Sequence, residues 1–196
     1  MNQRIDPAVW TTLFTEARSQ NGWLDKPVGE SLLHELYEIV RTGPTSMNCQ
    51  PARFVFLSTE AAKARLLPAL MPGNVEKTRT APVVAIVAYD SRFYEEMPRI
   101  WHNPAARDMF GGNAALAAST AFRNGSLQGG YMLLAARGLG LDCGPMSGFA
   151  TDKVDAEFFP DGRWKTNFLC GLGYGDPAKL MARQPRLPFE EVCRIL

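Results

Sequence analysis

The segment Pro44–Pro51 concentrates side chains that can bind a polar ligand, directly after the end of a helical pattern. Its two hydroxyls and two amides belong to Thr45, Ser46, Asn48 and Gln50. Such groups hydrogen-bond a heterocycle or a polyol chain without adding charge. The alternative is a capped turn that leads into a strand, and this stretch alone leaves both interpretations open.

Three smaller groups add cations and further amides: Arg18 with Ser19 and Asn21, Asn74 with Lys77, and Arg183 with Arg186. The middle pair is spaced by three residues, so both side chains share one face of a helix. The last pair offers two guanidiniums, which can hold a phosphate by paired hydrogen bonds. Each group taken alone is also compatible with solvated surface residues.

Other cofactor signals are missing from the sequence. The glycine-rich stretch 171–175 lacks Gly-x-Gly-x-x-Gly spacing and a later acidic residue, so it is no dinucleotide-binding fingerprint. Its glycines are better explained by close strand packing. If the protein uses a nicotinamide, we expect it to bind outside a dinucleotide-binding domain.

The cysteines and histidines predict neither a metal site nor a disulfide framework. The four cysteines are far apart and form no Cys-x-x-Cys pair, and only two histidines, His34 and His102, are present. A cysteine-dependent enzyme using Cys49 and His34 is a further alternative, but nothing in the sequence orients a triad.

The bulk composition bounds the class of protein. Twenty-one basic and twenty acidic residues leave a net charge of +1, which argues against a nucleic-acid binder. No run of about 18 apolar residues predicts a membrane helix, and the start lacks the apolar region of a signal peptide. We expect one cytoplasmic domain spanning residues 1–196.

Periodicity and punctuation predict an α+β fold with a mixed or antiparallel central sheet flanked by helices. Expected helices cover 6–20 with Asp6 as N-cap, 30–42, a short helix capped by Thr59, 114–139, and 151–158 capped by Thr151. Expected strands cover 53–57, 82–88, 140–145 and 168–174. The strand 82–88 is apolar on both faces and is therefore expected at the centre of the sheet.

Two segments indicate more than local structure. Residues 91–113 scatter aromatic side chains among prolines and glycines, which predicts either a flexible aromatic flap or a loop that covers the core. The helix 114–139 is apolar around its whole circumference and must be buried all round. A chain this small cannot easily enclose such a helix, so we expect a homodimer with this helix at its interface.

Taken together and in order, the stretches Arg18–Trp23, Pro44–Pro51, Asn74 with Lys77, and Gly140–Phe149 resemble the FMN-dependent nitroreductase family. They are most similar to its HadB/RutE-like, malonic semialdehyde reductase-like branch. The run Leu139–Phe149 is the most specific single match. Here Ala52 stands where the family has a tryptophan, Asn21 stands where a cation is common, and Ser147 replaces a glutamate or glycine.

The resemblance implies roles for these residues toward FMN. The turn 44–51 lines the flavin, the N-terminal region and the arginine run near the C-terminus hold its phosphate, Asn74 and Lys77 meet its pyrimidine edge, and backbone N–H groups after Gly144 point at N5 and O4. The implied cofactor-binding residues are Arg18, Ser19, Asn21, Pro44, Thr45, Ser46, Asn48, Gln50, Asn74, Lys77, Pro145, Met146, Ser147, Gly148, Arg183 and Arg186.

The resemblance also implies a reaction. NADH or NADPH gives a hydride to flavin N5, and a small electron acceptor then takes it. Malonic semialdehyde is the expected acceptor; alternatives are a general nitroaromatic or quinone reductase, or a non-catalytic flavin-binding protein. No catalytic side chain stands out. The candidate partners of a substrate carboxylate are Arg92, Arg99, Arg107 and Arg123.

Overall fold

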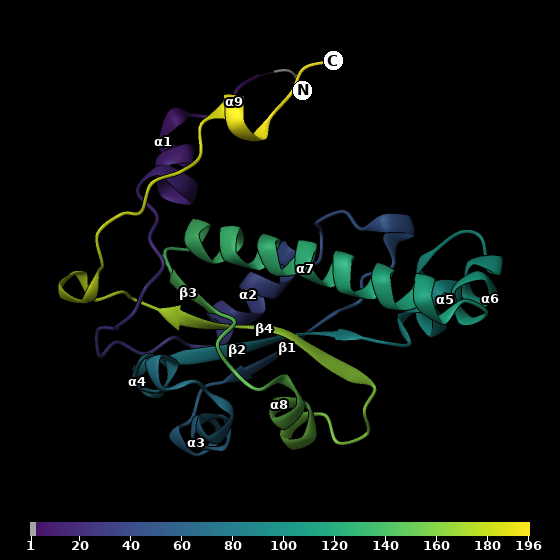
Figure 1. Cartoon of the computed structure of the whole chain (residues 1–196), viewed down its shortest axis with the longest axis horizontal. Helices are drawn as coiled ribbons and strands as arrows, with labels where there is room; N and C mark the ends of the chain where they lie inside the picture. Colours follow the sequence, from purple (N-terminus) through teal and green to yellow (C-terminus); the bar gives the residue numbers. More distant parts are fainter. Residues whose placement is uncertain (1–2) are drawn as a thin grey trace.

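A computed structural model describes residues 3–196 and shows a sheet covered by helices on both faces (Figure 1). The sheet has four strands, β1 (Ala52–Leu57), β2 (Val83–Asp90), β3 (Asp142–Met146) and β4 (Trp164–Gly173). Their order is β1-β2-β4-β3, and every neighbouring pair is antiparallel. The expected α+β fold is confirmed, with an antiparallel sheet.

The sequence pattern predicted the bounds of the inner strand β2 well and the start of the inner strand β4 poorly. β2 is buried on both faces along residues 83–88, as its unbroken apolar run predicts. β4 begins at Trp164, four residues before the expected start. Its first residues are largely polar, yet they pair with the end of β2 beyond an irregularity at Val87 and Ala88. Pairing with β2, rather than the polarity of its own residues, extends β4 to Trp164.

Helices of both faces form the layers that enclose the sheet. α2 (Glu30–Val40) and α7 (Ala114–Gly138) cover one face and share a core with β2 and β4. α3 (Glu60–Leu66) and α8 (Thr151–Phe158) cover the other. Thr59 caps α3 as expected, accepting from the Ala62 N–H at 3.1 Å. Thr151 does not cap α8, because Ala150 occupies the N-cap position and Thr151 is already helical.

The predicted N-terminal helix ends early. Asp6 caps α1 (Pro7–Trp10) at 2.8 Å, and a π-helical turn, Thr11–Thr15, follows it. Residues 16–20 then leave the helix, and Ser19 pairs with Cys143 at the free edge of β3. The Gln20 N–H donates to the Cys143 carbonyl at 2.9 Å. The unpaired edge of β3 outweighs the local helical preference, so the expected extension to Gln20 is wrong.

Residues 91–113 fold into short helices with a core of their own. A 3₁₀ turn (Phe93–Glu96), α5 (Met97–Ile100) and α6 (Ala105–Gly111) replace the expected irregular chain. Phe93, Met97 and Phe110 are buried against the first turns of α7. The aromatic residues therefore fill a satellite core, and the motion implied by a flap stays a prediction.

The long helix α7 ends within one residue of its expected boundary. One face packs on the sheet and is formed by small residues and Met132. Apolar side chains elsewhere on the helix remain uncovered: Leu116 is 38% exposed, Phe122 53% and Leu127 44%. The chain by itself thus leaves this helix partly open to solvent.

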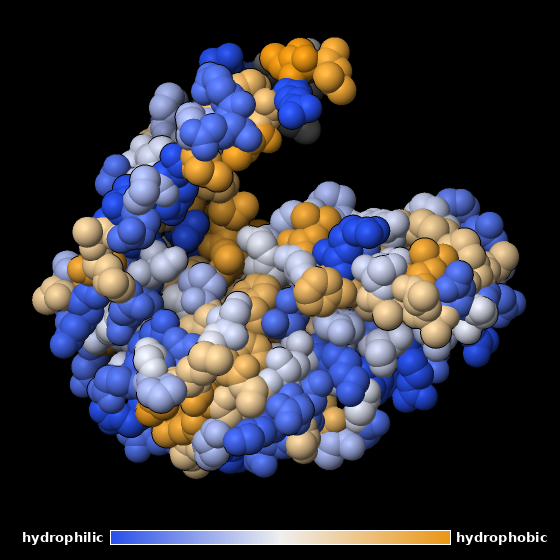
Figure 2. Space-filling view, viewed as in Figure 1, coloured by the Kyte–Doolittle hydropathy of each residue, from blue (hydrophilic) through white to orange (hydrophobic). Residues whose placement is uncertain are grey.

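Both ends of the chain leave the body together and form a terminal arm, defined here as residues 3–17 and 180–196 (Figure 1). The tail carries α9 (Phe189–Val192) and is exposed from Met181 onward. An open hollow separates the arm from α7, with apolar residues on the arm facing it (Figure 2). Exposed apolar side chains of the arm include Val9, Trp10, Phe14, Leu187, Phe189, Val192 and Ile195. No helix within residues 3–196 is long and apolar enough to cross a bilayer.

Candidate functional site

The turn 44–50 holds an unusual backbone conformation. Met47, Asn48 and Gln50 have positive φ angles of 50°, 54° and 39°, although none of them is a glycine. Such conformations cost on the order of 1–3 kcal/mol each and persist only where the surroundings fix them. A strained, polar turn that the protein maintains is a good candidate for a ligand-binding element.

Three polar side chains of α7 fix this turn. Asn124 Oδ1 accepts from the Ser46 N–H and Gln128 Oε1 from the Ala52 N–H, each at 2.9 Å. The Tyr131 hydroxyl donates to the Pro44 carbonyl at 2.9 Å. Asn124 and Gln128 are buried, each 4% exposed. Sequence reasoning did not predict this role; the available signal was a row of polar residues, spaced by four and three, in an otherwise apolar helix.

The side chains of the turn are partly engaged with one another. Asn48 donates to the Ile100 carbonyl at 2.8 Å and accepts from the Gln50 amide at 2.9 Å. Thr45 Oγ1 accepts from the Gln50 N–H at 3.2 Å. The hydroxyl of Ser46 is exposed. The turn therefore presents hydroxyls and amides held in place from behind, as a binding surface for a polar group requires.

A second group forms where the N-terminal segment, α4 (Pro72–Thr80) and the end of β3 meet. Asn74 Nδ2 donates to the Gly148 carbonyl at 2.8 Å, which joins α4 to the stretch 145–148. Trp23 Nε1 donates to the Lys77 carbonyl at 2.9 Å. A Cβ on Gly144 would lie 2.7 Å from the Gln20 carbonyl oxygen, so only glycine allows this close approach. This region brings together Arg18, Ser19, Asn21, Asn74, Lys77, Pro145, Met146, Ser147 and Gly148.

Lys77 is the electrostatic centre of this second group. Its side chain is half-buried, and desolvation lowers the pKa of its ammonium. No carboxylate of residues 3–196 forms an ion pair with it. A half-buried cation without an ionic partner is suited to a ligand that offers negative charge or carbonyl oxygens.

The three arginines expected to hold a phosphate behave differently. Arg18 donates to the Met181 carbonyl, and Arg183 Nη2 donates to the Thr15 carbonyl at 2.6 Å. These reciprocal bonds tie the tail to the N-terminal segment beside Ser19. Arg186 is exposed and bonds only tail carbonyls, at 2.9 and 3.1 Å. The structure therefore brings Arg18 and Arg183 to one region and leaves Arg186 further along the tail.

The two groups lie apart within one chain. The turn 44–50 lies beside the α5 end of α7, whereas α4 lies at the other end of the sheet (Figure 1). No hydrogen bond or β-bridge among the residues described joins one group to the other. The sequence-predicted site residues thus form two half-sites rather than one pocket.

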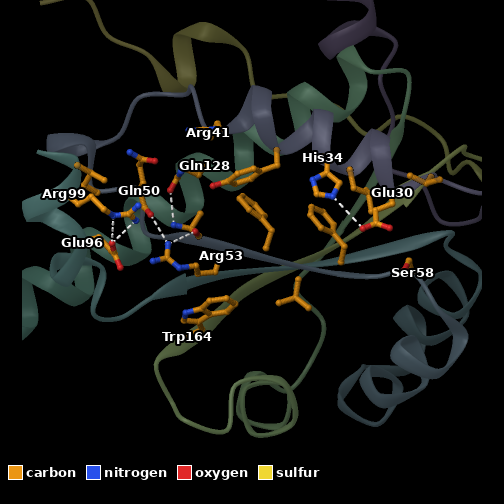
Figure 3. Close-up of a pocket in the computed structure, with 18 residues that line it drawn as sticks. Glu30, His34, Arg41, Gln50, Arg53, Ser58, Glu96, Arg99, Gln128 and Trp164 are labelled. Carbon is orange, nitrogen blue, oxygen red and sulfur yellow. Dashed lines mark hydrogen bonds and ion pairs between the residues drawn. The ribbon is translucent and has the colours of Figure 1, made fainter.

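A further cavity lies apart from most of both half-sites. It is a groove of about 1010 Å³ between α2 and the region of Trp164, and it is rich in arginine and aromatic side chains (Figure 3). The consecutive residues 52–56 of β1 all line it. Because successive side chains of a strand point to opposite faces, such a groove follows the open edge of the strand. Of the predicted cofactor-binding residues, only Gln50 lines it, together with Arg99, a candidate partner of the substrate carboxylate.

The cysteine alternative loses its chemical basis in the fold. Cys49 is buried, and burial raises the pKa of its thiol to about 11, so the reactive thiolate is not available near neutral pH. His34 is exposed and pairs with Glu30 at 3.7 Å. Within residues 3–196 no group of three or more His, Cys, Asp or Glu side chains is arranged to hold a metal ion.

Comparisons with known proteins identify the family of this chain. The model of the nitroreductase family matches residues 15–174. A relative from Ralstonia nicotianae, named as an NADH dehydrogenase/NAD(P)H nitroreductase, is 55% identical over 98% of both chains. The relative HadB of Ralstonia pickettii, named in the same way, is 54% identical over 94% of this chain and 95% of its own.

Solved structures show the same fold at low sequence identity. A nitroreductase from Exiguobacterium sibiricum, solved in complex with FMN, has a TM-score of 0.86 at 20% identity and covers 100% of this chain and 99% of its own. The nitroreductase ydfN of Bacillus subtilis has a TM-score of 0.83 at 22% identity, over 96% of this chain and 99% of its own.

Proposed function

This chain belongs to the nitroreductase family, and we propose that it is an FMN-dependent oxidoreductase that uses NADH or NADPH to reduce malonic semialdehyde to 3-hydroxypropanoate. The observation that carries the flavin assignment is the second group: Asn74 bonds the Gly148 carbonyl just beyond β3, and Lys77, three residues along α4, is half-buried without an ion-pair partner among residues 3–196. The relatives' names support the nicotinamide as reductant.

The residues present fit FMN in chemical type. Arg18 and Arg183, with Arg186 from the tail, supply guanidiniums for the phosphate. Lys77 and Asn74 supply a cation and an amide for the polar edge of the ring. The turn 44–50 supplies hydroxyls and amides. FMN, when bound, supplies the redox chemistry by accepting a hydride from NAD(P)H and passing it to the acceptor.

The side chains of the protein would bind the cofactor, orient it and tune its reduction potential. Lys77 would lie at the ring edge and favour negative charge there, and its partial burial would strengthen that attraction. Asn74 fixes the Gly148 peptide through its 2.8 Å bond, which orients the neighbouring backbone N–H groups. α7 holds the turn 44–50 in its strained form.

We propose that the two half-sites are completed by a second copy of the chain, which gives a homodimer with two active sites. The separation of the turn from the second group supports this, because neither half alone offers all the contacts that FMN requires. The uncovered apolar residues of α7 and of the terminal arm support it as well. The open edge of β1 and its groove are a third surface that the single chain leaves uncovered.

The acceptor is assigned from sequence similarity. Malonic semialdehyde follows from the similarity to the HadB-like branch, to which the 54% identical relative adds weight. A general nitroaromatic or quinone reductase is the second candidate, favoured by the nitroreductase names of the relatives. A flavin-binding protein without turnover is the remaining alternative.

An absorption experiment on the purified protein separates these functions. We expect the spectrum of bound oxidised flavin, bleached by NADH or NADPH without oxygen and restored by malonic semialdehyde. Restoration by nitrofurazone or benzoquinone but not by malonic semialdehyde would favour the general reductase. Colour without bleaching would favour the binding protein, and a protein that takes up no FMN would refute both flavin functions.

A further inference from the structure

Arg123 is an isolated charge in a long stretch of uncharged residues. It is the only charged residue between Asp108 and Arg137, and α7 contains no aspartate or glutamate at all. Arg137, the other cation of α7, already donates to the Leu13 carbonyl at 2.8 Å. Arg123 is exposed and belongs to no ion pair among the residues described.

Helix geometry places Arg123 on the side of α7 that faces away from the sheet. Gly125 is buried and faces the sheet, since a Cβ there would lie 3.0 Å from Tyr89 Cβ of β2. At about 100° per residue, Arg123 lies roughly 200° round the helix from Gly125. Leu116 and Leu127, both exposed, share this outer side. The stripe therefore consists of exposed apolar residues with one guanidinium in its midst.

The other arginines considered for a substrate carboxylate have acidic neighbours. Arg92 lies 3.9 Å from Glu95, and Arg99 lies 2.8 Å from Glu96. Arg107 is followed directly by Asp108. The charges of Arg92 and Arg99 are thus paired, whereas Arg107 and Arg123 form no ion pair among residues 3–196. Of these two, Arg123 is the one on α7, next to Asn124, which bonds the turn 44–50.

Packing α7 against a second copy would increase the need for an anion beside Arg123. Covering the outer stripe with a second copy removes Arg123 from water, and a buried charge is costly unless an anion pairs with it. The same helix of the partner has no carboxylate to offer. Arg123 is also adjacent to Asn124, which holds the flavin-lining turn through Ser46. The missing anion would therefore bind close to the proposed site.

We propose that Arg123 binds the carboxylate of the acceptor and so selects small oxo acids over neutral acceptors; this rests on the proposed function. The carboxylate of malonic semialdehyde supplies the anion that the helix and its neighbours lack. A guanidinium engages it by two parallel N–H···O bonds, which also sets the orientation of the aldehyde. Arg123 acts in binding and does not transfer a proton.

The test compares Arg123→Gln, Arg123→Lys and the control Arg107→Gln as FMN-loaded proteins. The first readout is the ratio of kcat/KM for malonic semialdehyde to kcat/KM for uncharged 1,4-benzoquinone. We expect this ratio to fall about ten- to a hundredfold in Arg123→Gln, the effect of losing one charge-assisted contact. The ratio should fall less in Arg123→Lys, because lysine keeps the positive charge but lacks the two parallel N–H donors of the guanidinium. Arg107→Gln should match the wild type.

The second readout is calorimetric binding of malonate, an unreactive dicarboxylate, to the same proteins. We expect binding to the wild type that is at least tenfold weaker in Arg123→Gln. Equal malonate affinity in both, or none in the wild type, would overturn the proposal. Loss of dimer or of FMN in Arg123→Gln by sedimentation and absorbance would assign Arg123 a structural role and overturn it too.

The two proposals fail in different ways. A wild type that does not reduce malonic semialdehyde but binds malonate through Arg123 refutes the proposed acceptor and supports the anion site. A wild type that reduces malonic semialdehyde, with an unchanged ratio in Arg123→Gln, supports the function and refutes the role of Arg123.

Discussion

Replacing Asn124 by leucine tests whether α7 holds the turn 44–50 in its binding conformation. The change keeps the number and branching of the side-chain heavy atoms but removes the acceptor of the Ser46 N–H, which lies 2.9 Å from Asn124 Oδ1. It also removes the donor to the Thr120 carbonyl at 2.9 Å, although that carbonyl lies within α7. The Ser46 bond is therefore the principal loss.

The structure sets the size of the effect. An unpaired buried N–H costs about 1–3 kcal/mol, but Ser46 is exposed and water replaces part of the bond, so we expect about 1–1.5 kcal/mol. For a chain of this length, each 1 kcal/mol lowers Tm by about 2–4 °C. The expected fall is thus roughly 2–6 °C. Because the same bond supports three positive-φ residues, FMN affinity should fall by about tenfold.

Differential scanning calorimetry of the apo protein and fluorescence titration with FMN measure the two effects. Ser119→Ala is the matched control, since Ser119 is exposed on the same helix and bonds only the Leu116 carbonyl at 3.1 Å. It should change stability by less than about 0.5 kcal/mol. An Asn124→Leu protein that keeps both its Tm and its FMN affinity would show that the turn does not depend on α7.

Three further outcomes follow from the site and the dimer. Lys77→Met should lower the flavin midpoint potential by about 20–45 mV, since an ammonium attraction of about 1–2 kcal/mol after screening is lost; spectroelectrochemistry showing no shift would place Lys77 away from the ring. Arg186→Ala should weaken FMN about ten- to a hundredfold but leave riboflavin, which lacks the phosphate, nearly unchanged; equal weakening in titrations would contradict the phosphate role. Leu127→Asp should abolish dimerisation and reduce FMN content. If the variant sediments like the wild type, α7 does not form the dimer interface.

The sequence predicted the bounds of those elements whose buried apolar residues follow a regular spacing. β2 and α7 were predicted almost to their ends, because burial on both faces or along a long helix leaves a clear trace in the sequence. The stretch 16–20 has no such trace. Its structure depends on the free edge of β3, which lies more than a hundred residues away, so no local pattern could reveal it.

Some features of the candidate site could likewise be predicted from the sequence, and others could not. Residue types alone indicated the polar turn and the Asn74–Lys77 pair. The positive φ angles of the turn could not be predicted, because they arise from contacts with Asn124, Gln128 and Tyr131 rather than from glycine. The polar residues of α7 were visible as breaks in an apolar helix, but their partners were not.

The separation of the half-sites gives the proposed dimer a thermodynamic consequence. The sequence groups the candidate residues by type, but the fold places the turn on one side of α7 and Lys77 near the end of β3. In the proposed dimer, a ligand that contacts both half-sites joins two copies, so it would bind the dimer in preference to the monomer. Such a ligand stabilises the assembly by mass action. Dimer formation in turn raises the ligand's affinity by the same free energy. FMN content and subunit association would then be two measures of one equilibrium, and a residue of α7 can influence flavin binding without touching the flavin.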